Sequence, residues 1–150
     1  MEILIYTMKV KIKKLHKDAI IPEYQKVDDA GFDICSDIDT NIYPGNKPKM
    51  ITTGISIEVP KGYVLTIRQR SGLSIIYPNY LSIGVGTVDS GYLGEIFVPV
   101  VNNSSSVWGI KRGDRIVQGI IHPIIQAQFE EVNELSKTDR GEEGFGSTGV

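Results

Sequence analysis

Apolar and polar side chains alternate along much of this chain, with the period of two that is typical of a strand with one buried face. Within residues 10–15, apolar side chains alternate with lysines. Within residues 55–59, isoleucines and a valine alternate with Ser56 and Glu58. Further strands are expected from the apolar runs at residues 63–70, 81–88, 96–101, 115–121 and 124–132. Turn-forming residues separate these runs, at positions 44–46, 60–62, 89–91 and 111–114.

Short strands at this spacing predict an all-β fold, a jelly-roll-like distorted β-barrel. Only residues 71–77 have the pattern of a short helix. A chain of 150 residues can bury one sizeable core but is too short for two domains. We therefore expect one β-barrel domain over residues 1–139. The glycine-rich segment 140–150 cannot bury enough surface to fold alone, so we expect it to be a mobile lid of the same domain.

Charge and cysteine content narrow the class of protein. A net charge of −2 gives no electrostatic reason to expect nucleic-acid binding, and the early lysines fit a solvated strand face. The single cysteine, Cys35, excludes an internal disulfide framework and is compatible with a reducing compartment. It is expected to be a small core residue rather than a nucleophile. No apolar stretch is long enough to span a bilayer. The sequence predicts a cytoplasmic protein without nucleic-acid or membrane partners.

Two segments in the first half carry candidate binding groups. Asp33 lies in the apolar run 30–34, where a structural pairing is favoured over direct catalysis. Arg70, Ser71 and Gly72 follow a predicted strand. Arginine offers a bidentate fork, serine a donor, and glycine lets the backbone approach an anion. A surface arginine before a turn is the plain alternative.

Two further segments follow later strands. Asp89 ends an apolar run and begins the sequence Asp-Ser-Gly. A carboxylate there could act as a general base or bind a metal, or could simply start a turn. Gln118 lies in an otherwise apolar strand, where an amide needs hydrogen-bond partners. It is either a ligand contact or a satisfied core glutamine.

The fifth segment is the glycine-rich end of the chain. Gly141 and Gly146 have the spacing of a phosphate-binding P-loop, but Ser147 replaces the required lysine, so a P-loop is excluded. Glycine N–H groups, hydroxyls and Arg140 could still wrap a polyphosphate, and Phe145 could stack on a base. An ordinary disordered terminus is the alternative.

Together the segments resemble the five motifs of the trimeric dUTPases, in that family's order and at about its spacing: AGFDI, RSGL, GTVDSGY, GDRIVQ and RGEEGFGSTG. The resemblance covers roughly residues 9–149. It implies hydrolysis of dUTP to dUMP and pyrophosphate, which limits uracil incorporation into DNA and supplies dUMP for thymidylate synthesis. It also implies a homotrimer whose active sites are shared between subunits.

The resemblance assigns roles residue by residue. Asp89 would be the base that activates water for attack on the α-phosphorus, and Gln118 would hold the α-phosphate or the water. Tyr92 would pack under the deoxyribose. The other implied contacts are Arg70, Ser71 and Gly72 at phosphates, Gly84, Val85, Gly86 and Val88 at uracil, and Arg140, Phe145, Gly146, Ser147 and Thr148 in the closing tail. Mg²⁺ would be held by the triphosphate and waters, with Asp33 reaching it at most through a water and no direct protein ligand expected.

Two rival classes share much of this pattern. The related dCTP deaminases have the same fold, but they lack the glycine-rich tail and a tyrosine at the sugar, so Phe145 and Tyr92 argue against them. A binding or regulatory protein could keep the nucleotide site and act on a partner. The presence of Asp89, Arg70 and Gln118 together argues that catalysis persists.

Overall fold

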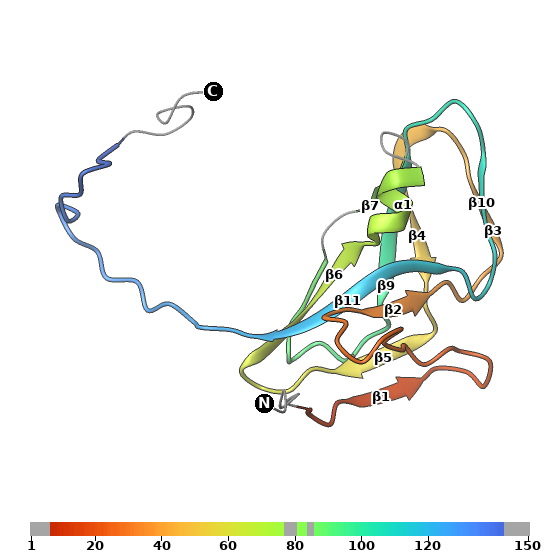
Figure 1. Cartoon of the computed structure of the whole chain (residues 1–150), viewed down its shortest axis with the longest axis horizontal. Helices are drawn as coiled ribbons and strands as arrows, with labels where there is room; N and C mark the ends of the chain where they lie inside the picture. The colour runs from red at the N-terminus through yellow and green to blue at the C-terminus, as the bar shows by residue number, and fades with distance from the viewer. Residues whose placement is uncertain (1–6, 77–80, 84–85, 143–150) are drawn as a thin grey trace.

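The computed structural model describes residues 7–76, 81–83 and 86–142 of the chain (Figure 1). Within them the backbone is almost entirely strand and loop. The strands are β1 Lys11–Lys14, β2 Phe32–Cys35, β3 Thr40–Ile42, β4 Gly45–Thr52, β5 Ile55–Glu58, β6 Tyr63–Gln69, β7 Leu81–Ile83, β8 Gly86–Val88, β9 Phe97–Asn102, β10 Trp108–Ile110 and β11 Arg115–Pro123. One six-residue helix, α1 (Ser71–Ile76), follows β6 and confirms the predicted short helix.

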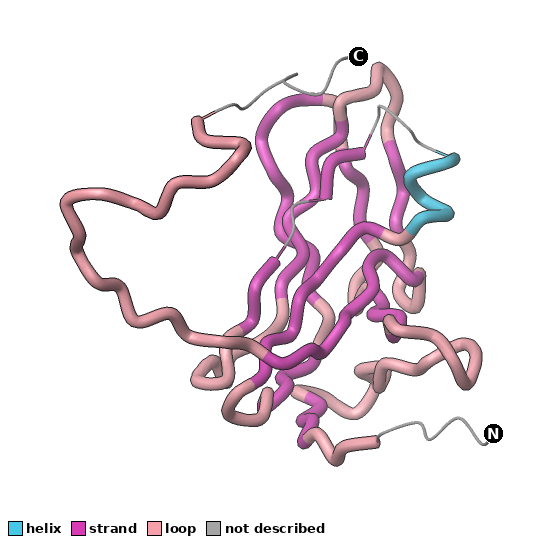
Figure 2. The backbone as a smooth tube through the Cα atoms, turned by 60° about the vertical axis from the view of Figure 1, so that its left-hand side comes forward, coloured by secondary structure: helices cyan, strands magenta, loops and turns pink. Residues whose placement is uncertain are grey.

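The strands form four antiparallel sheets. Figure 2 shows the strands, in magenta, packed together in one domain. Two sheets are pairs, β1–β5 and β3–β10. The third has the order β4–β9–β7, and the fourth has the order β2–β11–β6–β8. The all-β prediction is confirmed, although the hydrogen bonds between the described strands do not close into a single barrel.

The core is built by the period-two pattern that the sequence displays. In β9, Val98 and Val100 are fully buried while Phe97 is exposed. In β6, the Leu65 and Ile67 side chains point into the same buried cluster, and Arg68 is exposed. Fully burying one such aliphatic side chain contributes about 1.5–3 kcal/mol to folding, so this alternation fixes which face of each strand is inside.

Two strand predictions need correction. The run 81–88 is not one strand, because β7 pairs with β9 while β8 pairs with β6, in a different sheet. The run 124–132 forms no strand. After the Ile124 N–H donates to the Gly62 carbonyl, the segment leaves the sheets (Figure 1). The Ile125 and Phe129 side chains are 98% and 95% exposed.

Cys35 also differs from its prediction as a core residue. It ends β2 and is only half-buried. Burial raises the pKa of its thiol, and the negative charge of Asp33 adds to that rise. Because the thiolate is the nucleophilic form, the raised pKa lowers the fraction of Cys35 that is nucleophilic near neutral pH. No helix in the described part of the chain is long and apolar enough to cross a bilayer.

Close packing explains one glycine in β11. A Cβ at Gly119 would lie 2.5 Å from Phe32 Cε2 and 2.9 Å from Leu65 Cδ1. Glycine therefore leaves room for the Phe32 ring, which also packs edge-on against Tyr24 with the ring centroids 5.6 Å apart.

We expect Gly119→Ala to lower the free energy of unfolding by about 1–3 kcal/mol, because overpacking displaces the Phe32 ring. The matched control is Gly109→Ala, where the new Cβ would lie 3.4 Å from Asn41 Oδ1, an ordinary contact. Urea unfolding of both variants measures the difference. Equal stabilities for the two variants would contradict the packing argument.

Candidate active site

Four of the five candidate segments lie in strands of one sheet, β2–β11–β6–β8, or directly after them. Asp33 lies in β2, and Gln118 lies in β11 directly opposite it. Arg70 follows the end of β6, and Asp89 follows the end of β8. Antiparallel pairing of strands from distant parts of the chain thus gathers the predicted side chains onto a single sheet.

Asp33 is the centre of a charged cluster. It is 8% exposed, and its carboxylate accepts hydrogen bonds from two arginines. Arg70 Nε donates to Oδ1 at 2.7 Å, and Arg115 Nη1 donates to Oδ2 at 3.3 Å. Arg70 Nη1 also donates to the Arg115 carbonyl at 3.2 Å. The structure supports the pairing role expected for Asp33, and the two guanidinium groups leave this end of the sheet with an excess of positive charge.

Gln118 and the start of α1 belong to the same end of the sheet. Gln118 is half-buried, and a Cβ at Gly31 would lie only 3.1 Å from its Oε1. The glycine of the first segment therefore makes space for the amide. Ser71 and Gly72 are exposed and follow Arg70 directly. This end of the sheet therefore combines a positive charge, a hydroxyl, a side-chain amide and accessible backbone. Groups of these kinds bind phosphate oxygens.

A second group of predicted residues surrounds the turn after β8. The Tyr92 N–H donates to the Asp89 carbonyl at 3.0 Å and closes this turn, which leaves Asp89 exposed. Gly86, Val88 and Tyr92 line a cavity of about 200 Å³, whose other walls come from β6 and the start of β9. This group therefore combines an exposed carboxylate with a small, partly apolar recess.

The two groups do not meet within one chain. Val88 lies opposite Leu65 in β6, whereas Arg70 follows the far end of that strand. Asp89 and Arg70 are thus about six residues apart along β6, or about 20 Å at the usual rise of a strand. A single chain offers two partial sites rather than one complete site.

The remaining predicted residues lie elsewhere. Arg140 is exposed on the segment that follows β11. Gly84 and Val85, and the tail residues Phe145, Gly146, Ser147 and Thr148, lie outside the described residues. Among the described residues, no three histidine, cysteine or carboxylate side chains are grouped to hold a metal ion.

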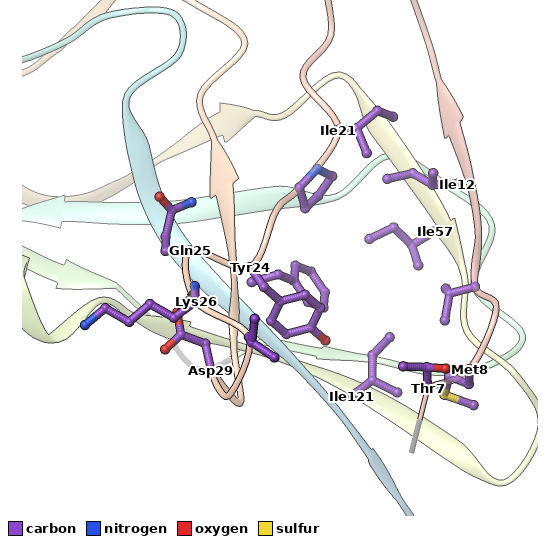
Figure 3. A pocket seen from close by; sticks show the side chains of 14 residues that line it. Thr7, Met8, Ile12, Ile21, Tyr24, Gln25, Lys26, Asp29, Ile57 and Ile121 are labelled. Carbon is purple, nitrogen blue, oxygen red and sulfur yellow. Dashed lines mark hydrogen bonds between the residues drawn. The ribbon is translucent and has the colours of Figure 1, made fainter. Parts of the chain in front are cut away.

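A larger cavity lies elsewhere in the described part of the chain, and none of the predicted site residues line it. It measures about 800 Å³ and lies between β1, β5, β11 and the loop before β2. Figure 3 shows Ile12, Ile57 and Ile121 around the ring of Tyr24, whereas Lys26 and Asp29 lie on the polar side of the loop. Most of the residues that line this cavity are apolar, and such a lining is suited to packing rather than to phosphate chemistry.

Sequence reasoning missed two members of the charged cluster. Arg115 lies inside the quoted GDRIVQ segment, but no role was predicted for it. Its Nη1 donates to Gln25 Oε1 at 2.9 Å, across 90 positions of sequence. The motif could have indicated the arginine, but nothing in the loop sequence indicates Gln25.

Comparison with known proteins identifies the family. A family model described as dUTPase matches residues 17–149. The chain belongs to the dUTPase family. It is 48% identical to the deoxyuridine 5′-triphosphate nucleotidohydrolase of Nautilia profundicola over 95% of this chain and 99% of the relative. The enzyme of the same name from Clostridium tetani is 42% identical, over 96% and 97%.

Solved dUTPase structures agree with the fold. The Staphylococcus bacteriophage 80alpha dUTPase with dUpNHpp matches with a TM-score of 0.87 and 30% identity, over 96% of this chain and 100% of that one. A dUTPase of the S. aureus phage phi11, described with a structural Mg(II) ion, matches with a TM-score of 0.77 and 26% identity, over 84% and 97%. The predicted family, its jelly-roll-like fold and its enzyme activity, dUTP diphosphatase, are confirmed.

We expect Asp33→Asn to lower the free energy of unfolding of this dUTPase by about 2 kcal/mol, because asparagine keeps one acceptor oxygen but no charge, so one of the two charge-assisted hydrogen bonds is lost and the other is weakened. The KM for dUTP should rise at the same time, since Arg70 is then oriented less firmly. The control is Asp28→Asn, an exposed carboxylate on the preceding loop. Urea unfolding and steady-state kinetics test this, and unchanged stability and KM would show that the cluster does not position Arg70.

Proposed function

We propose that this dUTPase converts dUTP to dUMP and pyrophosphate by directing a water molecule at the α-phosphorus, with Asp89 as the general base. The exposed carboxylate of Asp89, on the tight turn beside the Tyr92 recess, is the observation that supports this. A positioned carboxylate accepts the proton of the attacking water, and phosphate charge is balanced by fixed donors. Gln118 holds the α-phosphate or the water.

The phosphates bind at the end of β6, where Arg70 follows the strand. Arg70 is oriented by Asp33, so its guanidinium is pre-positioned rather than free to rotate. Ser71 and Gly72 add a hydroxyl and open backbone. Arg140, Gly146, Ser147 and Thr148 clasp the outer phosphates, and Phe145 covers the base.

Nucleoside selection belongs to the recess beside β8. Tyr92 packs under the deoxyribose and leaves no space for a ribose 2′-hydroxyl. Backbone groups of residues 84–86 and Val88 read uracil, and the closeness of the fit excludes the methyl group of thymine. These roles are supported by Gly86, Val88 and Tyr92 lining one cavity.

The reaction uses Mg²⁺, which supplies positive charge to the phosphate oxygens as they become more negative. The Asp33 oxygens are already bound by Arg70 and Arg115, so Asp33 reaches the ion at most through a water. The products place the enzyme in nucleotide metabolism, where it lowers dUTP and supplies dUMP. Its cytoplasmic location remains a prediction from the absence of a disulfide framework.

The active assembly is a homotrimer whose sites are shared between subunits. The separation of about 20 Å between the Asp89 and Arg70 groups supports this, because a triphosphate site needs both within one substrate's length. The segment after β11 adds support, since Ile125, Phe129 and Leu135 are exposed large apolar residues. Exposed apolar surface of this kind marks a contact with another chain. Residues 140–150 then act as a lid, delivered by that segment onto a neighbouring site.

Asp89→Asn should lower kcat by about 10²- to 10⁴-fold, because the water loses its proton acceptor, while KM changes little. Pyrophosphate release from dUTP with Mg²⁺ measures kcat, and a parallel assay of ammonia from dCTP tests the deaminase alternative. Turnover within a few fold of the unchanged enzyme would move the base elsewhere. Ammonia release would assign the other reaction.

Light scattering should give the mass of a trimer at working concentration. Co-refolded mixtures of two inactive variants, Asp89→Asn and Arg70→Ala, should then recover activity, because about a quarter of the shared sites in random trimers receive both intact groups. The same variants mixed without unfolding are the control. No recovery after co-refolding, or an active monomer, would contradict shared sites.

A further inference from the structure

Glu95 lies beside the sugar recess but has no role in the reaction described above. It lines the same cavity of about 200 Å³ as Tyr92. The Tyr92 hydroxyl donates to the Glu95 carbonyl at 2.8 Å. The Tyr92 ring also folds over Gly94, where a Cβ would lie 2.5 Å from the ring's Oη and 2.7 Å from its Cζ. The orientation of the ring therefore depends on where residues 94 and 95 are held.

Glu95 is itself held by the turn between β4 and β5. Its Oε1 accepts the Gly54 N–H at 2.9 Å. The next residue continues the attachment, since the Ile96 N–H donates to the Ile55 carbonyl at 3.0 Å. The Thr53 hydroxyl donates to the Ile96 carbonyl at 2.7 Å. Three hydrogen bonds thus join residues 95–96, just after the Tyr92 turn, to residues 53–55.

The attachment point is rigid. Gly54 has a φ of +67°, and a Cβ there would lie 2.8 Å from His16 Nε2 and 3.0 Å from Asp37 Cγ. Behind it, the His16 and Asp37 side chains are joined at 2.6 Å between Nε2 and Oδ2. The Leu15 N–H donates to the Gly54 carbonyl at 2.8 Å. Loops from three parts of the chain therefore fix the backbone amide that Glu95 binds.

We propose that Glu95 is a positioning residue for sugar selection: by binding Gly54 it fixes the turn that holds the Tyr92 ring, and so sets the preference for dUTP over UTP. The inference rests on the proposed contact between Tyr92 and the deoxyribose. A ring excludes a 2′-hydroxyl only if it cannot retreat by a fraction of the hydroxyl's size, so selectivity depends on the support behind the ring. If Glu95 had only a structural role, its replacement would change kcat/KM for dUTP and for UTP by the same factor.

The test is the ratio of kcat/KM for dUTP to kcat/KM for UTP, measured by pyrophosphate release. Glu95→Ala should lower this ratio about tenfold, through loss for dUTP and gain for UTP. Glu95→Gln keeps an Oε1 acceptor for the Gly54 N–H, so its ratio should stay within about twofold of the unchanged enzyme. Tyr92→Phe removes only the bond to the Glu95 carbonyl and should lower the ratio as Glu95→Ala does.

The matched control is Glu58→Ala, which removes a glutamate that accepts a hydrogen bond from Lys11 Nζ at 3.1 Å and does not line this cavity. It should leave the ratio unchanged. An unchanged ratio in Glu95→Ala, or equal losses for both substrates, overturns the inference. If Glu95→Ala does not fold, an unchanged ratio in Tyr92→Phe overturns it. An unchanged ratio in Tyr92→Ala would overturn the sugar contact itself, which separates failure of the proposed function from failure of the positioning role.

Discussion

The register of β6 with its two neighbours is the constraint on which the rest of the site depends. β11 pairs along β6 so that Gln118 lies opposite Arg68, near the end where Arg70 follows. β8 pairs with the same strand so that Val88 lies opposite Leu65, toward the other end. Because a strand is stiff and its side-chain period is fixed, a shift by one residue would turn every side chain to the opposite face. The register therefore holds Arg70 and the proposed general base, Asp89, apart within each chain.

The phosphate end of the sheet is organised around a buried carboxylate. Taking Asp33 out of water is costly, and its hydrogen bonds from Arg70 and Arg115 offset that cost. The same contacts restrict the arginine side chains to one geometry, which a solvated arginine would lack. Since one carboxylate meets two guanidinium groups, a net positive charge remains to attract an anionic substrate. Local folding energetics and the proposed phosphate binding by Arg70 thus involve the same residue.

The sugar end depends on a different kind of support. The Glu95 carboxylate does not balance a charge in the proposed reaction. Its oxygen accepts a hydrogen bond from the Gly54 backbone amide, and the packed His16 and Asp37 side chains fix the position of that amide. Hydrogen bonds to rigid backbone hold a neighbouring group more reproducibly than bonds to long, flexible side chains. Both ends of the site are therefore positioned by contacts that are distant in sequence.

The sequence by itself determined what local chemistry can specify. Alternation predicted the strands around Leu65 and Val98, the composition after β6 predicted α1, and the five motifs predicted the family together with Asp33, Arg70, Asp89 and Gln118. The tertiary structure alone decided which of these residues meet. It split the run 81–88 between two sheets, left residues 124–132 outside any sheet, and joined Arg115 to Gln25 and Glu95 to Gly54. The physical reason is that periodicity and turn chemistry act over a few residues. Register, packing space and ion pairing arise only when distant strands come together.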